Sequence, residues 1–198
     1  MYLLANLRIA GSITKSLLTF FKDEIGRGTF WANLRSMIKA QEITEDMSWA
    51  ELIEEKARKY GDRTFLIFED KEFSFRQMDE NANRVANYLL TLGAGKGKGV
   101  AIIMGNCPEY LDVYIGSQKL GMYSIPINTS LRGDSLLYIL DHSDAEFVVI
   151  DEEFLDAYNK IAEKVEKRKK IIVNRAAQSG TSPLPKGMLN LADAYRQS

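Results

Sequence analysis

Apolar residues from residue 48 onward alternate between short continuous runs and longer stripes at helical spacing. The expected strands are 64–69, 72–74, 100–104, 123–127, 146–150 and 170–174. The expected helices are 49–60, 75–92, 108–120, 134–142 and 152–167. Strands joined by helices form βαβ units with right-handed crossovers. The pattern therefore predicts an α/β fold: a mostly parallel sheet flanked by helices.

Two helix starts carry a specific signal. Ser48 with Glu51 and Ser74 with Gln77 are capping boxes, in which each side chain bonds the other residue's backbone N–H. The β-rich run 64–69 and residues 72–74 flank a plausible turn and predict a small hairpin. After residue 174 the pattern fades into a loop, and 189–195 has room for at most two helical turns.

The first 47 residues differ from the rest and are expected to form an amphipathic helical extension, followed by one αβ domain over 48–198. Residues 1–40 carry six basic and two acidic side chains. Two helical apolar stripes with basic polar faces are typical of helices lying in a membrane interface. Packing against the same protein is the alternative. Arg8, Lys15 and Lys22 interrupt the continuous apolar stretch that a signal peptide needs.

Composition excludes several classes of protein. The 198 residues have a formal net charge of −1, which argues against a nucleic-acid partner. One Cys and one His cannot assemble a zinc site or an intramolecular disulfide. No stretch approaches the roughly 20 apolar residues of a membrane-spanning helix. We expect a cytoplasmic protein, with peripheral contact at the inner membrane face if residues 1–47 bind lipid.

A glycine-rich run at 93–99 resembles a phosphate-binding loop in composition only. Such a loop follows a strand and opens a helix, so that the helix amides meet the anion. Here the expected helix comes first and the strand follows. We interpret the run as a flexible connection from helix to strand.

Two polar loops follow expected strands: Gly105-Asn106-Cys107-Pro108-Glu109 and Asn128-Thr129-Ser130-Leu131. Parallel sheets bind ligands beyond the carboxyl ends of their strands, so these loops are candidates for lining a pocket. Capping of the next helix is the alternative. A thiol at a helix start, as at Cys107, can have a lowered pKa. For His142, near a helix end, we expect a surface or capping role.

Three segments together resemble the amino-terminal region of adenylate-forming enzymes. They are Trp49–Thr64, Phe73–Met78 (FSFRQM) and Gln118–Asn128 (QKLGMYSIPIN), and they occur in the family's order. The second is similar to the family's first core motif, and Leu120–Asn128 is similar to its second. The stretch Asn128–Leu136 (NTSLRGDSL) looks most like the long-chain and very-long-chain acyl-CoA synthetases, including the fatty-acid transport proteins.

The resemblance implies a two-step reaction that uses ATP, Mg²⁺ and coenzyme A. A fatty-acid carboxylate attacks the α-phosphate of ATP, which releases pyrophosphate and gives the acyl-adenylate. The thiol of coenzyme A then displaces AMP. Residues Ser179–Gly187 (SGTSPLPKG) resemble the family's phosphate loop, with Lys186 at the position of the lysine in its Pro-Lys-Gly ending. However, Pro183 replaces a flexible glycine, and the following residues look like the connection before the true loop. Both interpretations stay open.

The family's later motifs, including the adenine motif, the hinge and the catalytic lysine, are missing from the chain. We therefore assign no catalytic, cofactor-binding or metal-binding residue. The chain is expected to be the amino-terminal part of a long-chain fatty acid–CoA ligase, inactive alone, with an uncovered sheet edge that favours homo-oligomers. Fatty acid, ATP and CoA would bind only through the remainder of the enzyme. The alternatives are a non-catalytic binding or membrane-associating module and a free-standing nucleotide-binding protein.

Overall fold

The computed structural model describes residues 48–166, 169–175 and 183–196. The chain divides into two units, 1–47 and 48–198, and only the second lies within this description. The helices expected in the first 47 residues lie outside it. The described part begins with helix α3 (Trp49–Tyr60), the antiparallel hairpin β1 (Thr64–Phe68) and β2 (Lys71–Ser74), and helix α4 (Phe75–Thr91). Both predicted capping boxes are present, with Ser48 on α3 and Ser74 on α4.

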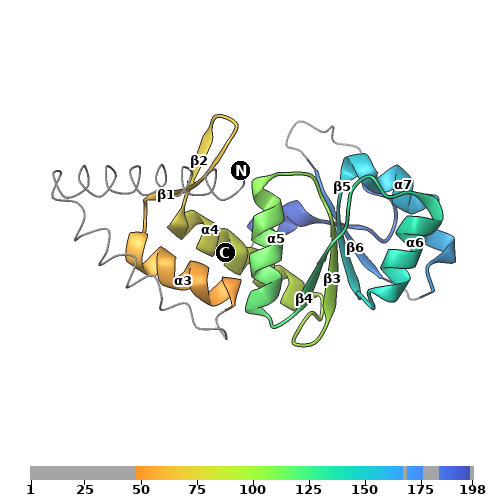
Figure 1. Cartoon of the computed structure of the whole chain (residues 1–198), viewed down its shortest axis with the longest axis horizontal. Helices are drawn as coiled ribbons and strands as arrows, with labels where there is room; N and C mark the ends of the chain where they lie inside the picture. Colours follow the sequence, from red (N-terminus) through yellow and green to blue (C-terminus); the bar gives the residue numbers. More distant parts are fainter. Residues whose placement is uncertain (1–47, 167–168, 176–182, 197–198) are drawn as a thin grey trace, which may run out of the picture. The chain divides into compact units, whose positions relative to one another are not determined.

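The remaining elements alternate as the apolar pattern predicts (Figure 1). In chain order they are β3 (Gly99–Ile103), α5 (Pro108–Lys119), β4 (Tyr123–Pro126), α6 (Gly133–His142), β5 (Phe147–Asp151), α7 (Leu155–Asn159), β6 (Lys170–Asn174), β7 (Leu189–Asn190) and the 3₁₀ helix η4 (Leu191–Arg196). Within the described residues, one sheet has the strand order β4-β3-β5-β6-β7, and every pair in it is parallel. The predicted α/β fold with its small hairpin is confirmed.

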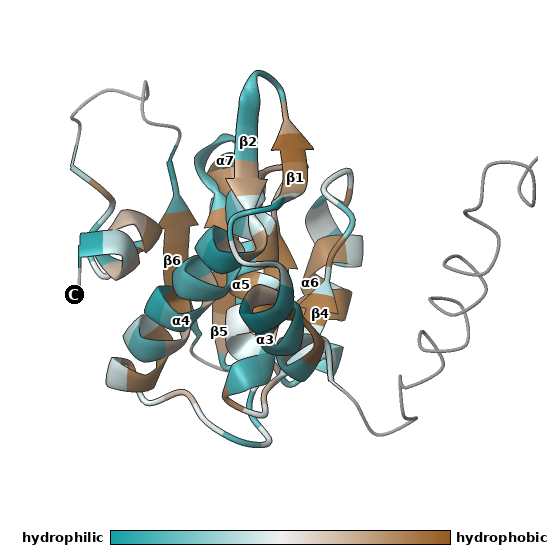
Figure 2. Cartoon of the chain, turned by 90° about the vertical axis from the view of Figure 1, so that its left-hand side faces the viewer, coloured by the Kyte–Doolittle hydropathy of each residue, from teal (hydrophilic) through white to brown (hydrophobic). Residues whose placement is uncertain are grey.

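Each central strand is buried on both faces. In β3, Val100 and Ile102 point into a core shared with α4, α5 and η4, while Ala101 and Ile103 point into a core shared with α6 and α7. The alternation follows from the two-residue period of a strand. Helices α4 and α5 therefore cover one face of the sheet and α6 and α7 the other (Figure 1). Apolar residues gather in the strands and polar residues on the outer surfaces of α3 and α4 (Figure 2).

Helices α4 and α5 approach closely at a glycine. A Cβ atom added at Gly116 of α5 would lie 2.7 Å from the carbonyl oxygen of Ala82 on α4. Nearby, Lys119 Nζ lies 2.7 Å from Asp79 Oδ1, and both side chains are largely buried. This pair and the glycine fix how α4 lies on α5, and α5 carries residues of the site described below.

The long helix predicted over 152–167 is wrong. Its described part consists of a 3₁₀ turn at Glu152–Phe154, the five-residue helix α7 and a second 3₁₀ turn at Ala162–Lys164. The buried apolar residues Leu155, Tyr158 and Ile161 are spaced by three. This spacing suits tight, 3₁₀-like turns better than a continuous α-helix. In the last segment, Leu189–Asn190 pairs with β6 as a strand, and 3₁₀ turns follow.

Candidate functional site at the carboxyl edge of the sheet

Asp151 joins three strand ends at the carboxyl edge of the sheet. It is the last residue of β5, and its Oδ2 accepts a 2.7 Å hydrogen bond from the backbone N–H of Gly105, which follows β3. Its Oδ1 accepts a 2.9 Å bond from the side-chain amide of Asn174, the last residue of β6. Burial raises the pKa of Asp151, while the bonds from Asn174 and Gly105 act in the opposite direction. One carboxyl group thus holds the loops that leave β3 and β6.

A charged pair lies next to this cluster. Arg175 directly follows β6, and its Nη2 lies 2.6 Å from Oε1 of Glu152, which directly follows β5. The Arg175 side chain is only 15% exposed. The pair therefore orders the first residues beyond the two central strands.

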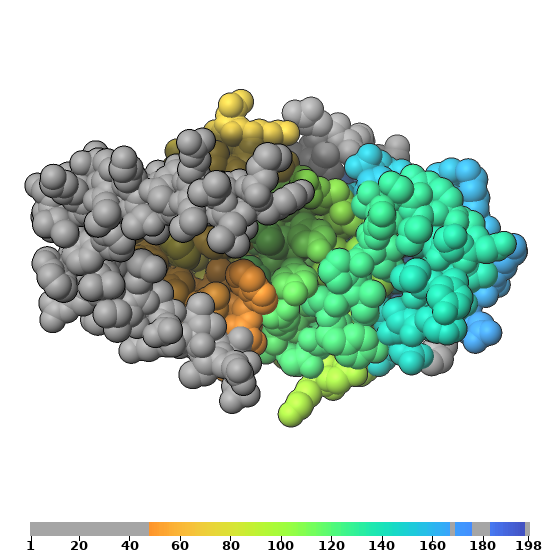
Figure 3. Space-filling view, viewed as in Figure 1, coloured from red at the N-terminus to blue at the C-terminus, as the bar shows by residue number. Residues whose placement is uncertain are grey.

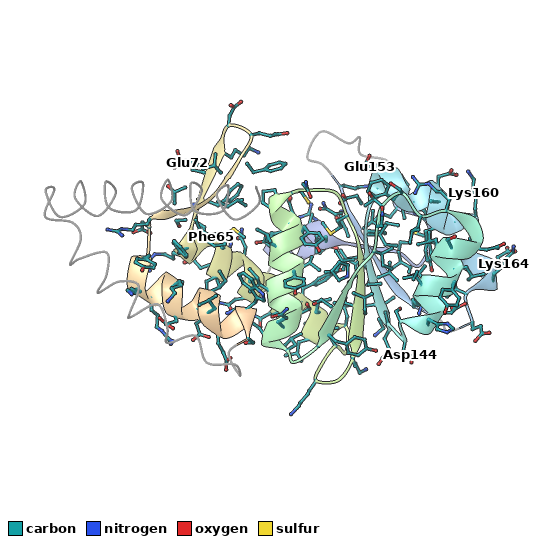
Figure 4. All side chains as sticks on the ribbon, viewed as in Figure 1. Phe65, Glu72, Asp144, Glu153, Lys160 and Lys164 are labelled. Atoms are coloured by element: carbon teal, nitrogen blue, oxygen red, sulfur yellow. The ribbon has the colours of Figure 1, made fainter. Side chains whose placement is uncertain are left out.

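These strand ends and the β1–β2 hairpin enclose a cavity of about 740 Å³. From the sheet side it is lined by the loop after β3, the start of α5 and the residues that follow β5 and β6. From the hairpin side, two aromatic rings and a lysine contribute: Phe68, Lys71 and Phe73. Glu153 lies near the sheet's carboxyl edge, and Glu72 lies on the hairpin (Figure 4). The cavity is where an open parallel sheet is expected to bind a ligand.

The charges of the cavity do not suit ATP phosphates. Two cationic side chains, Lys71 and Arg175, face a larger set of carboxylates: Glu69, Glu109, Asp151, Glu152 and Glu153. One of the two cations is already paired with Glu152. A phosphate site needs an excess of positive charge or a group of free backbone amides. Within the described residues, no group of three or more His, Cys, Asp and Glu side chains is arranged to hold a metal ion. No chemical step through ATP or Mg²⁺ is therefore assigned to these residues.

Cys107 lines the cavity, and the lowered thiol pKa that a position at a helix start can give is not found. Burial raises its pKa to about 12, and the negative charges of Asp151 and Glu109 add to the effect, against a backbone hydrogen bond at Tyr110. Cys107 precedes Pro108, which occupies the first turn of α5 as predicted. The helix start does not compensate for the loss of water around the thiol.

The second polar loop lies beside a different hollow. Asn128 Oδ1 accepts a 2.9 Å bond from the N–H of Ser130, which closes a local turn. Leu131 and residues of α6 line a hollow of about 400 Å³. Residues of α6 form part of the molecular face drawn in Figure 3. Helix capping by these two loops is wrong, because Cys107 and Arg132, the residues before α5 and α6, make no side-chain capping bond. The sequence predicts that both loops lie at the same edge of the sheet. Of the two, the loop Gly105–Glu109 lines the large cavity and the loop Asn128–Leu131 does not.

His142 is exposed at the end of α6 and stacks on Tyr138, with ring centroids 4.2 Å apart. The predicted surface position is confirmed. The run 93–99 connects α4 to β3, also as predicted.

Lys186 lies in the turn that leads into β7. The N–H of Met188 bonds the carbonyl of Pro185 at 3.1 Å, and Gly187 has a φ of 89°. Leu189 follows at once and pairs with Ile172 of β6. Lys186 therefore precedes a strand and is exposed, whereas a phosphate loop follows a strand and precedes a helix. Residues 176–182 lie outside the description.

Several residues of the cavity are not among those predicted from the sequence. Asp151 and Asn174 each end a buried strand, so the rule that singled out Gly105 also applied to them. The hairpin residues Phe68 and Phe73 carried no such signal, because only the folded chain brings the hairpin over the sheet edge.

A parallel sheet with helices on both faces, preceded by a helix and a hairpin, defines an α/β protein whose candidate site lies at its strand ends. Residues 53–193 match the family model described as AMP-binding enzyme, and the chain belongs to this adenylate-forming family. It is 34% identical over 125 residues to the crotonobetaine/carnitine–CoA ligase of Salmonella typhimurium.

Solved structures agree on the fold. The anthranilate CoA ligase in complex with anthranoyl-AMP is 27% identical, has a TM-score of 0.69, and is matched over 79% of this chain and 29% of its own. A long-chain-fatty-acid–CoA ligase from Archaeoglobus fulgidus is 20% identical and has a TM-score of 0.63. The match covers 74% of this chain and 29% of that ligase. The Salmonella match covers 61% of this chain and 24% of the relative. The chain thus spans about a quarter of the length of the curated relatives it matches.

Among the described residues, none of the helices combines the length and the apolar character needed to cross a bilayer.

Proposed function

We propose that this chain supplies the amino-terminal part of a long-chain fatty acid–CoA ligase, which converts fatty acid, ATP and CoA to acyl-CoA, AMP and pyrophosphate. The observation that carries the proposal is the family match over residues 53–193, together with relatives named as CoA ligases. The long-chain substrate rests on the sequence of Asn128–Leu136 alone. These residues form the loop after β4 and the start of α6.

The described residues have a scaffolding role in this proposal. Asp151 and the Arg175–Glu152 pair order the carboxyl edge, and the acidic cavity leaves the phosphates to be bound by groups outside these residues. ATP, Mg²⁺ and CoA are thus partners of the whole enzyme. The chain alone is expected to be inactive.

An experiment at the native gene tests the proposal. A tag placed at the amino terminus of the chromosomal copy recovers the protein with any polypeptide that continues or accompanies it. The product is incubated with ATP, Mg²⁺, CoA and one acid at a time: palmitate, octanoate, carnitine or benzoate. Palmitoyl-CoA, detected by mass spectrometry, is the expected main product. A thioester of another acid would overturn the long-chain assignment, and no thioester from any acid would count against a ligase.

Contact of residues 1–47 with a membrane surface belongs to the same proposal, because their basic and apolar pattern suits an interface. Co-sedimentation with anionic liposomes is compared for the whole chain and a chain starting at Ser48. Stronger pelleting of the whole chain is expected, and equal pelleting would contradict membrane contact.

A further inference from the structure

Among the described residues, the 3₁₀ helix η4 is held in the molecule by buried apolar residues and one long-range side-chain bond. Leu191 and Ala194 are fully buried in the core formed with α4 and the sheet. Tyr195 packs against the same core, and its hydroxyl donates a 2.8 Å hydrogen bond to Oδ2 of Asp112 on α5. The side chain of Arg196 pairs with Asp193 of the same turn. Tyr195 is therefore the polar link between η4 and α5.

Asp112 is an unusual partner for this link. The residue is 1% exposed, and its second oxygen, Oδ1, has no hydrogen-bond partner among the described residues. A buried carboxylate is normally paired with a cation or fully hydrogen-bonded, because loss of water strongly disfavours the charged form. Asp112 has neither arrangement, so the docked structure favours its neutral form.

The groups around Asp112 do not compensate for burial. Burial raises its pKa to about 7, and Glu109, one turn earlier on α5, acts in the same direction. The hydroxyl of Tyr195 on η4 and the charge of Arg84 on α4 act in the opposite direction. The effect of burial is the largest of these. Because Tyr195 covers the carboxyl, release of η4 would return Asp112 to water and towards the ordinary pKa of an aspartate.

We propose that Asp112 is a proton-controlled latch for η4: the segment Leu191–Arg196 stays docked against α4 and α5 while Asp112 is protonated and opens more often when Asp112 is ionised. The sign follows from proton binding. Between the ordinary pKa, near 4, and about 7, the docked state holds a proton that the open state has released. Each unit of rising pH in this window therefore increases the ratio of open to docked segment by up to about tenfold. Above about pH 7 the ratio levels off.

Hydrogen exchange in the whole chain tests the latch. Exchange of a peptide covering 189–196 is followed by mass spectrometry from about pH 5 to pH 8 and corrected for the intrinsic pH dependence of exchange. The wild-type protein should lose protection of this peptide as pH rises, while a β3 peptide (Gly99–Ile103) keeps its own. Asp112→Asn removes the charge and should make the protection independent of pH. Equal pH dependence in both proteins, or constant protection in the wild type, would overturn the latch.

A second measurement does not depend on the folding of Asp112→Asn. The carboxyl ¹³C signal of Asp112 is titrated in wild-type protein and in Tyr195→Phe, which keeps the ring and removes the donor. A midpoint near 7 is expected in the wild type, and a higher one in Tyr195→Phe because the carboxylate loses its hydrogen bond. A wild-type midpoint near 4 would contradict the latch, whatever the enzyme activity of the protein.

Discussion

Asp151 and Asn174, the last residues of two neighbouring parallel strands, are joined side chain to side chain by a 2.9 Å hydrogen bond at the carboxyl edge of the sheet. The other oxygen of Asp151 accepts the N–H of Gly105, which follows a third strand. This one residue therefore determines how the loops of the candidate site leave the sheet.

Replacing Asp151 with Ala should destabilise the protein by roughly 1–3 kcal/mol, because two partly buried donors lose their acceptor. Urea unfolding followed by circular dichroism measures the change. Glu153→Ala is the matched control, because Glu153 is an exposed carboxylate of the same cavity, and it should change stability by less than about 0.5 kcal/mol. Equal effects of the two variants would contradict the role of Asp151.

Replacing Gly116 with Ala should force α4 and α5 apart. The new Cβ would lie 2.7 Å from the carbonyl oxygen of Ala82, which is backbone and cannot move aside alone. We expect a loss of roughly 1–3 kcal/mol in spite of the better helix propensity of Ala. Thermal unfolding tests this against Gly95→Ala, where a Cβ meets nothing within 4 Å. Gly95→Ala should leave stability unchanged or slightly higher, and a comparable loss there would refute the packing argument.

The strands were predictable because their apolar runs are continuous, and the starts of α3 and α4 because the capping boxes are local in sequence. The cavity and the Asp112–Tyr195 bond could not be predicted, because they depend on residues far apart in the chain. The bond joins residues 83 positions apart. The raised pKa of the Cys107 thiol could not be predicted, because a position at a helix start is visible in the sequence and burial is not. The single helix predicted from Glu152 was wrong because a three-residue apolar spacing is compatible with both an α-helix and 3₁₀ turns.

Cys107 should react slowly with thiol reagents in the folded protein. With its pKa raised to about 12, the thiolate fraction near pH 8 is lower than that of an ordinary cysteine by on the order of a hundredfold or more. The reaction with Ellman's reagent should therefore accelerate strongly when urea unfolds the protein. The signal is unambiguous because the chain has one cysteine. Similar rates in the folded and unfolded protein would show that the thiol is not shielded.

Replacing Lys186 with Ala should leave the use of ATP unchanged, because this exposed lysine lies in a turn that enters a strand. The apparent KM for ATP of the protein recovered from its native gene is the relevant measurement. Lys164→Ala, at another exposed position, serves as the control. A several-fold rise in KM for Lys186→Ala alone would establish that residues 179–187 bind phosphate.

We propose that this chain is the amino-terminal part of an acyl-CoA ligase and depends on further residues for its chemistry. Palmitate-dependent exchange of labelled pyrophosphate into ATP tests it most directly, since it reports acyl-adenylate formation without CoA. We predict exchange in the protein recovered through the tagged native gene and none in the isolated 198-residue chain. Exchange in the isolated chain, or no acid-dependent exchange in either sample, would contradict this assignment.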